Sequence, residues 1–171
     1  MKFITKRRFQ TLVTNDKYWQ HRWKYIDVAI SILKTKKFNS VLELGPYKAP
    51  IVSTSDVMDF KSHIDVIKFL WDARNTPWPI KDKTYDMFIA LQVWEHLYTS
   101  ATDLSIGYQE QAFSEVMRIS KSALLSFPYK WKHGKANHRG IDKQKISQWT
   151  LNIPPLEIIP VGNKLVYYFE F

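Results

Sequence analysis

The sequence predicts an α/β fold, in which a mostly parallel sheet carries helices on its faces and ends in an antiparallel strand. Short apolar segments typical of strands alternate with helical or loop segments through most of the 171 residues. The last two such segments, residues 156–161 and 165–171, flank Gly162 and Asn163, a pair suited to the tight turn of a hairpin. Crossover connections make parallel neighbours, whereas a hairpin makes an antiparallel pair.

The periodicity of apolar residues predicts the elements in order. A first helix is expected from Asn15, as its cap, to about Lys36, because apolar side chains recur at steps of three and four. A second helix is expected at residues 109–120 and a short one at 142–149. Short apolar runs bounded by Gly, Pro or polar residues predict strands at residues 41–45, 55–59, 65–70, 85–91, 123–127, 156–161 and 165–171.

Length and composition predict one domain spanning residues 1–171, with a helical cap at 1–37 and the α/β core at 38–171. The chain has no cysteine, which excludes disulfides, thiolate zinc sites and cysteine nucleophiles and fits a reducing compartment. No uninterrupted run of about 18 apolar residues occurs, so no membrane span is expected. We therefore expect a cytoplasmic protein.

The formal net charge of +9 has two interpretations. One is a partner that carries negative charge, such as a phosphorylated or nucleotide-linked substrate, RNA or an anionic membrane surface. The other is a solvated surface rich in scattered lysines. Composition alone leaves both open.

Polar residues at strand ends indicate where a ligand would bind, because ligands of such sheets lie at the carboxyl ends of the strands. Gly45 follows the first strand, where the absence of a Cβ lets the backbone approach a ligand. Glu43, an acid within that strand, either meets the ligand or makes a structural contact to backbone amides or a lysine. Asp59 ends the second strand, where a carboxylate can accept hydrogen bonds from two ribose hydroxyls or lie in a solvated loop.

The most specific signal is a set of motifs in fixed order. The chain contains Trp71-Asp72-Ala73, then Pro77-Trp78-Pro79, Tyr85-Asp86-Met87-Phe88-Ile89-Ala90-Leu91-Gln92-Val93-Trp94-Glu95-His96-Leu97 and Glu115-Val116-Met117-Arg118-Ile119-Ser120-Lys121. This series, from about Phe38 to Trp149, resembles the class I S-adenosylmethionine-dependent methyltransferases. The resemblance implies a Rossmann-like, seven-stranded sheet and S-adenosylmethionine (SAM) as the cofactor.

The resemblance also assigns roles to individual residues. The methionine part of the cofactor would meet Glu43, Gly45 and Pro46, and the ribose hydroxyls would meet Asp59. The adenine edge would meet Asp72 and the Ala73 amide. The region beside the transferable methyl group would be formed by Leu91, Gln92 and Val93.

The first loop departs from the family pattern. The family has Gly-x-Gly-x-Gly there and then a full helix, whereas here Pro46-Tyr47-Lys48-Ala49-Pro50 follows Gly45. The interval to Asp59 is too short for a strand, a loop and a three-turn helix, so the first crossover helix is expected to be reduced or missing. That loss would leave part of one sheet face uncovered near Ile51 and Val52, where a partner could bind.

Histidines supply the candidates for catalysis. His138 and His133 lie in a basic loop after the fifth strand, and either could take a proton from the acceptor. The pair Glu95-His96 either orders the loop after the fourth strand or acts in catalysis. The five histidines show no pair at the spacing of metal ligands on a helix or ribbon, so no metal is expected.

These features predict a SAM-dependent methyltransferase acting on a small, anionic acceptor such as a sugar, a nucleotide-sugar or another metabolite. The cations Lys130, Lys132, Lys135 and Arg139 after the fifth strand favour the negative charge. Two alternatives remain open. One is an RNA-directed methyltransferase or RNA-binding domain, suggested by the net charge and by Trp131 among lysines. The other is a non-catalytic protein that uses the fold for interaction, which the missing glycines suggest.

Overall fold

The sheet has seven strands in the order β3-β2-β1-β4-β5-β7-β6, and only the pairings of β7 are antiparallel. The computed structural model describes every residue except 15, 17–18, 20, 66, 101–102 and 133–134. The strands are β1 (Val41–Leu44), β2 (Asp56–Asp59), β3 (Phe69–Leu70), β4 (Met87–Leu91), β5 (Ser122–Pro128), β6 (Glu157–Val161) and β7 (Lys164–Glu170). The predicted α/β class, the parallel sheet and the final hairpin are confirmed.

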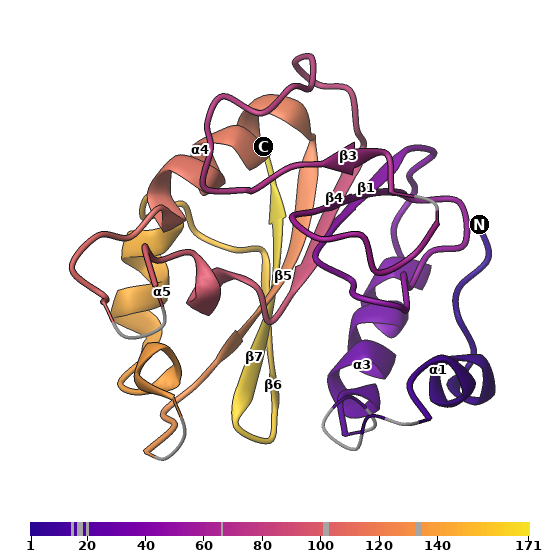
Figure 1. Cartoon of the computed structure of the whole chain (residues 1–171), viewed down its shortest axis with the longest axis horizontal. Coiled ribbons are helices and arrows are strands. Elements are labelled where there is room, and N and C mark those ends of the chain that lie inside the picture. Colours follow the sequence, from indigo (N-terminus) through magenta and orange to yellow (C-terminus); the bar gives the residue numbers. More distant parts are fainter. Residues whose placement is uncertain (15, 17–18, 20, 66, 101–102, 133–134) are drawn as a thin grey trace.

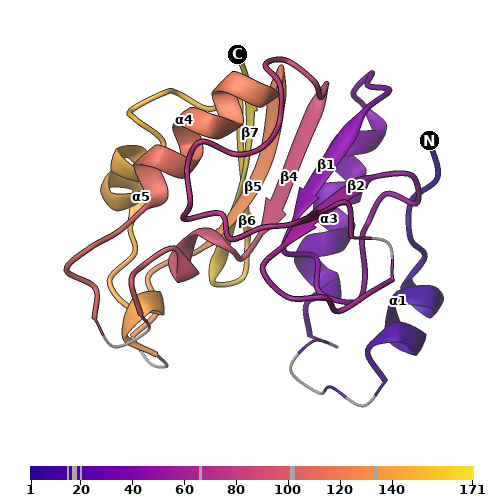
Figure 2. The ribbon, with the colours of Figure 1, turned by 45° about the horizontal axis from the view of Figure 1, so that its top comes forward.

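Helices cover both faces of the sheet (Figures 1 and 2). On one face lie α1 (Lys6–Leu12) and α3 (Trp23–Lys34), and on the other lie α4 (Gln109–Ile119) and α5 (Lys143–Trp149). Two 3-10 turns follow strands: η1 (Trp94–His96) comes after β4, and η2 (Ala136–His138) comes after β5. Within the helices that the structure describes, none is long and apolar enough to cross a membrane.

The alternating pleat of the strands builds two cores. In β4, Met87 and Ile89 point to the core beneath α1 and α3, while Phe88 and Ala90 point to the core beneath α4 and α5. Both faces of the central strands are therefore buried, which explains why these strands are continuous apolar runs in the sequence. Burying one such large side chain stabilises the fold by about 1.5–3 kcal/mol.

The first crossover helix is missing, as predicted. Residues 45–55, all of which the structure describes, contain turns and no helix. The loop is held from below by Glu43, whose buried carboxylate accepts hydrogen bonds from the N–H groups of Ile51 (2.8 Å) and Val52 (2.7 Å) and from the Ser55 hydroxyl (2.8 Å). Burial raises the pKa of Glu43 to about 7, although these three hydrogen bonds lower it.

The expectation of an uncovered sheet face is wrong. Ile51 and Val52 are buried in the core that also contains Phe9 of α1. The N-terminal segment adds to the cover, because Phe3 forms an antiparallel bridge with Val52 and the Ile4 N–H donates to the Ile51 carbonyl at 2.9 Å. Residues distant in sequence thus replace the missing helix.

Two elements are much shorter than predicted, whereas the bounds of the others differ by one or two residues. The third strand is reduced to Phe69–Leu70, because β3 pairs with β2 only at Met58 and Asp59. The long N-terminal helix begins at Trp23, after a turn in which the Arg22 N–H donates to the Trp19 carbonyl. The expected cap, Asn15, lies outside the described residues.

Candidate active site

A cavity of about 440 Å³ opens at the carboxyl ends of β1, β2 and β4, where the order of the strands reverses. Its volume is in the range of small-molecule sites. Six of the residues proposed from the sequence as cofactor contacts line it: Gly45, Asp59, Asp72, Ala73, Gln92 and Val93. The other three, Glu43, Pro46 and Leu91, line a small adjoining cavity behind Gly45. The structure therefore brings most of the predicted set together.

Gly45 is required by the backbone at the end of β1. Its φ is +62°, and a Cβ added there would lie 3.1 Å from Cγ2 of Val93. Its N–H donates to the Met58 carbonyl at 2.9 Å, which fixes the turn against β2. Only glycine adopts this conformation without strain and leaves the cavity floor open.

Asp59 is a buried acid whose carboxylate is only weakly satisfied by the protein. It is 4% exposed and lines the cavity. Its Oδ1 accepts a long hydrogen bond of 3.4 Å from the Lys61 N–H. Burial raises its pKa, against smaller opposing effects of nearby N–H groups and of His63. A carboxylate in this state has capacity to accept hydrogen bonds from a ligand.

An aromatic wall lines the same cavity as Asp59. Trp19 stacks on Tyr47 with ring centroids 4.5 Å apart, and Tyr47 meets the edge of His63 at 4.7 Å. The Arg22 guanidinium lies 3.7 Å from the centroid of the Trp19 ring. Tyr47 adopts a φ of +57°, unusual for a residue other than glycine, so the loop itself orients this ring. No pattern in the sequence indicated that Tyr47 would take part.

Asp72 lines the cavity but is tied to Arg74. Both carboxylate oxygens of Asp72 accept hydrogen bonds from Arg74, the shortest from Nη2 at 2.6 Å. This bidentate pairing lowers the pKa of Asp72. Arg74 also donates to the carbonyls of Tyr98 (2.9 Å) and Thr99 (3.1 Å), so it links two walls of the cavity. The sequence motif pointed to Asp72 but not to this arginine.

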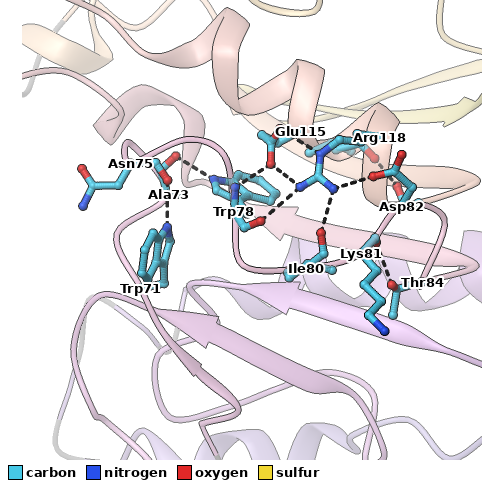
Figure 3. A network of polar contacts seen from close by, with 12 residues as sticks. Trp71, Ala73, Asn75, Trp78, Ile80, Lys81, Asp82, Thr84, Glu115 and Arg118 are labelled. Carbon is cyan, nitrogen blue, oxygen red and sulfur yellow. Dashed lines mark hydrogen bonds and ion pairs between the residues drawn. The ribbon is translucent and has the colours of Figure 1, made fainter.

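The loop that carries Asp72 and Ala73 is anchored to α4 (Figure 3). Arg118 pairs with Glu115 at 2.6 Å and also donates to the carbonyls of Ile80 (2.7 Å) and Trp78 (3.2 Å). Glu115 accepts the Trp78 N–H at 2.6 Å, and the Trp78 indole donates to the Ala73 carbonyl at 3.0 Å. The motif around Glu115 and Arg118 therefore acts structurally, by holding the cavity wall in place.

Gln92 ends β4 with a φ of +59° and is held by β5. Its N–H and its side-chain amide donate to the Ser126 hydroxyl at 3.0 and 3.1 Å. This strained turn directs the following residue, Val93, over Gly45. The local geometry explains why Gln92 and Val93 line the cavity while Leu91 packs in the core beneath α3.

A cluster of ionisable groups lies in the turns after β4 and β5, and two of its members, Glu95 and His96, line the cavity. Glu95 is 2% exposed, and its Oε1 lies 3.9 Å from Nε2 of His96. The rings of His96 and His138 meet edge to face at 5.1 Å. Asn137 joins the two 3-10 turns, because its Nδ2 donates to the Glu95 carbonyl at 2.6 Å and lies 3.1 Å from Nδ1 of His96.

The surroundings of this cluster shift the pKa values of its side chains. Burial raises the pKa of Glu95 to about 7, against opposing effects of Arg22 and Lys164. Burial also lowers the pKa of His138, and nearby cations, Lys135 first, lower it further. His138 is thus a buried, neutral imidazole near pH 7. His133, the other candidate base, lies outside the described residues.

Comparison with solved structures shows which known proteins share this fold. The chain is similar to a SAM-dependent methyltransferase from Aquifex aeolicus, at 14% identity and a TM-score of 0.62, over 96% of this chain and 97% of that one. It is also similar to the N-methyltransferase NodS from Bradyrhizobium japonicum WM9, at 13% identity and a TM-score of 0.59, over 91% and 98% of the two chains. An rRNA methylase from Escherichia coli matches at 12% identity and a TM-score of 0.58, over 96% of this chain and 69% of that one.

The chain therefore has a Rossmann-like fold that these methyltransferases share, which is the fold that its motifs led us to expect. No protein-family model matches the chain, and no curated protein is detectably similar to it in sequence. The likeness thus concerns the fold, and the identity of the ligand has to be argued from the cavity itself.

Proposed function

We propose that the protein transfers a methyl group from SAM to a small, anionic acceptor. The observation that carries the proposal is the position of Asp59. Its buried, weakly satisfied carboxylate faces a cavity of about 440 Å³ at the end of β2, with the Cβ-free backbone of Gly45 beside it. A carboxylate placed there can accept hydrogen bonds from two adjacent ribose hydroxyls.

The residues present fit the parts of SAM. Asp59 would hold the ribose, Gly45 would let the methionine part approach the backbone, and Ala73 and Val93 offer apolar surface. The bound cofactor supplies an electrophilic methyl group on a sulfonium. The protein's own task is to align the acceptor with that methyl group and to exclude water. The aromatic wall of Trp19 and Tyr47 would help to exclude water from one side of the cavity.

Positive charge favours an anionic acceptor. Lys130, Lys132, Lys135 and Arg139 are exposed in the loop after β5, and Arg22 lines the cavity. Lys135 is close enough to lower the pKa of both His96 and His138. Such a field raises the local concentration of phosphate- or carboxylate-bearing molecules. His138, kept neutral by its surroundings, could accept the proton that the acceptor loses.

Calorimetric titration with SAM and with S-adenosylhomocysteine tests the central claim. We expect both to bind to a single site, and we expect the Asp59→Ala variant to bind each more weakly. A folded protein that binds neither compound would contradict the proposal and would favour the non-catalytic alternative.

RNA is the second candidate acceptor, favoured by the net charge of +9 and by the similarity of the fold to an rRNA methylase. An RNA-directed enzyme would bind RNA with an affinity that falls steeply with salt. A methyl-transfer assay with labelled SAM should therefore compare a panel of phosphorylated and carboxylated metabolites with total RNA. Label appearing only in RNA would overturn the small-acceptor proposal and leave SAM dependence intact.

A further inference from the structure

The cluster of Glu95, His96 and His138 beside the cavity has the composition of a metal site. Glu95 and His96 come from η1, and His138 comes from η2. The two turns are far apart in the chain but adjacent in space, because Asn137 of η2 donates a hydrogen bond to Glu95, 42 residues before it. One ligand atom from each of Glu95, His96 and His138 can be chosen so that all three lie within 4.8 Å of one another. Two imidazoles and one carboxylate are donors that suit zinc and its neighbours in the first transition series.

Two of these donors are buried and unsatisfied. Glu95 is 2% exposed, and its Oε2 has no hydrogen-bond partner among the described residues. His138 is 7% exposed, and within the same part of the chain its Nε2 has none either. Buried polar atoms are nearly always paired, and each exception requires an explanation. A ligand that contacts both atoms would supply the missing partner.

The scaffold holds the donors close together before any ion binds. The hydrogen bond from Asn137 to the Glu95 carbonyl, at 2.6 Å, clamps η1 to η2. The edge-to-face contact of the two imidazoles limits their rotation further. His96 is the most accessible of the three, with 45% of its side chain exposed, and it lines the cavity together with Glu95. An ion held here would keep an open coordination position toward the cavity, as catalytic zinc sites do.

We propose that Glu95, His96 and His138 bind one zinc-class transition metal ion at the acceptor end of the cavity. The binding itself does not depend on the proposed methyl transfer. Its use rests on that function: the open position would bind an anionic oxygen of the acceptor and so orient it, and His138, as a ligand of the ion, would then not act as the base. The sequence analysis considered Glu95, His96 and His138 for catalysis or loop order and not as metal ligands, because they come from two segments far apart in the chain.

The surroundings select the kind of ion. The positive charges of Arg22, Lys135 and Lys164 act on the cluster. They repel a cation, so an ion that is attracted by charge alone would bind poorly. Magnesium and calcium prefer several oxygen ligands, and here only one carboxylate is offered. Ions with high intrinsic affinity for imidazole, such as Zn²⁺ and Co²⁺, can bind despite the positive field. Binding at Nε2 of His96 moves its ring proton to Nδ1, which requires the contact with Asn137 to rearrange.

Cobalt supplies a direct test, since its visible absorption reports coordination. The full chain is stripped of metals with a chelator and titrated with Co²⁺, and Zn²⁺ or Mg²⁺ is then added in competition. We expect ligand-field bands that saturate at one Co²⁺ per chain. Zn²⁺ should abolish them, whereas a large excess of Mg²⁺ should leave them unchanged.

Variants locate the ion. Glu95→Gln, His138→Gln and His96→Gln should each weaken Co²⁺ binding by about tenfold or more, the scale of losses seen when metal sites are perturbed. His63→Gln is the matched control, because His63 lines the same cavity but lies outside the cluster. Circular dichroism checks that each variant folds. His96→Gln changes the most exposed position, so it still tests the site if the variants at the two buried positions do not fold.

Absence of Co²⁺ bands in the wild type would overturn the proposal, as would equal affinity in the wild type and the three cluster variants. SAM titration of the same metal-free protein separates the two proposals. If SAM binds and Co²⁺ does not, the metal site is wrong and the proposed function stands.

Discussion

Oε1 of Glu43 accepts the backbone N–H of Val52 at 2.7 Å, and this bond ties β1 to the loop that replaces the first crossover helix. The two interpretations of Glu43 left open by the sequence now differ in support. Its carboxylate is occupied by backbone amides and a serine hydroxyl, and it does not line the larger cavity. We infer a structural role, through which Glu43 also positions the backbone that leads from Gly45.

Replacing Glu43 with Gln should change how stability depends on pH. The pKa of Glu43 is raised from 4.5 to about 7 by burial, so the folded state binds the proton more tightly than the unfolded state. Stability contributed by this proton is fully present below pH 4.5 and is lost as pH rises through about 7. The loss amounts to at most about 3–4 kcal/mol for a shift of this size.

Urea denaturation of wild type and Glu43→Gln between pH 4.5 and 8 measures the effect. The wild type should lose more stability than the variant as pH rises over this window. At pH 8 the variant should still be less stable by about 1–3 kcal/mol, because one amide oxygen cannot serve the three donors. Parallel pH curves for the two proteins would show that Glu43 titrates normally.

Replacing Asp59 with Ala should weaken SAM binding by about 1.5–3 kcal/mol, the usual loss for hydrogen bonds to a charged group. Asp59→Asn, which keeps one acceptor oxygen, should lose less. Asp65→Ala is the control, because Asp65 is exposed in the loop after β2 and does not line the cavity. Calorimetry provides the affinities, and an unchanged value in a folded Asp59→Ala protein would remove Asp59 from the site.

Replacing Arg74 with Ala should lower SAM affinity several-fold although Arg74 was not predicted to bind the cofactor. The change frees Asp72 and releases the carbonyls of Tyr98 and Thr99, so two walls of the cavity lose their link. The stability lost should be modest, about 1 kcal/mol or less, because the pair is partly exposed.

The comparison of Asp72→Ala with Arg74→Ala tells how Asp72 acts. If Asp72 only holds Arg74, the two variants and the double variant should lose the same affinity. If Asp72 also reads the adenine edge, Asp72→Ala should lose more, and an analogue lacking the adenine amino group should be less affected by that variant. Arg7→Ala, at an exposed position of α1, controls for loss of positive charge.

The fold was predictable because most of its elements produce local patterns in the sequence. The apolar runs of β4 and β5, the turn at Gly162 and the apolar periodicity of α4 each depend on neighbouring residues. The short interval after Gly45 was enough to predict the missing helix. The burial of the sheet face near Ile51 and Val52 was not predictable in the same way, because Phe3 and α1 cover it through contacts that are distant in sequence.

The site was predictable only in part, for a similar reason. Gly45, Asp59 and Val93 sit at strand ends, so topology alone brings them together. Tyr47 and Arg74 enter through backbone conformation and side-chain pairing, which no spacing rule describes. The sequence-based expectation of no metal considered only histidine pairs at local spacing, and the cluster that includes His138 is formed by the fold.

The aromatic residues gathered in the N-terminal segment, Trp19, Trp23 and Tyr25 among them, lead us to predict that it closes over the cofactor, and Trp19 provides the contact to test. Trp19 lines the cavity and stacks on Tyr47, whereas Trp23 packs on Phe9 at 5.6 Å and does not line it. Saturating SAM should therefore change the tryptophan emission and protect residues 19–25 from hydrogen exchange. Tyr18, another aromatic residue of this segment, lies outside the described residues.

Substitution separates the sources of this signal. Trp19→Phe should remove most of the SAM-induced change in emission, and Trp23→Phe should leave it intact. Trp71 also lines the cavity, so Trp71→Phe measures the contribution of that second tryptophan. If the full change persists in Trp19→Phe and disappears in Trp71→Phe, and residues 19–25 exchange equally fast with and without SAM, then the segment does not close over the cofactor. Retained SAM affinity in Trp23→Phe is required for the comparison, because loss of the contact with Phe9 could otherwise disturb α3.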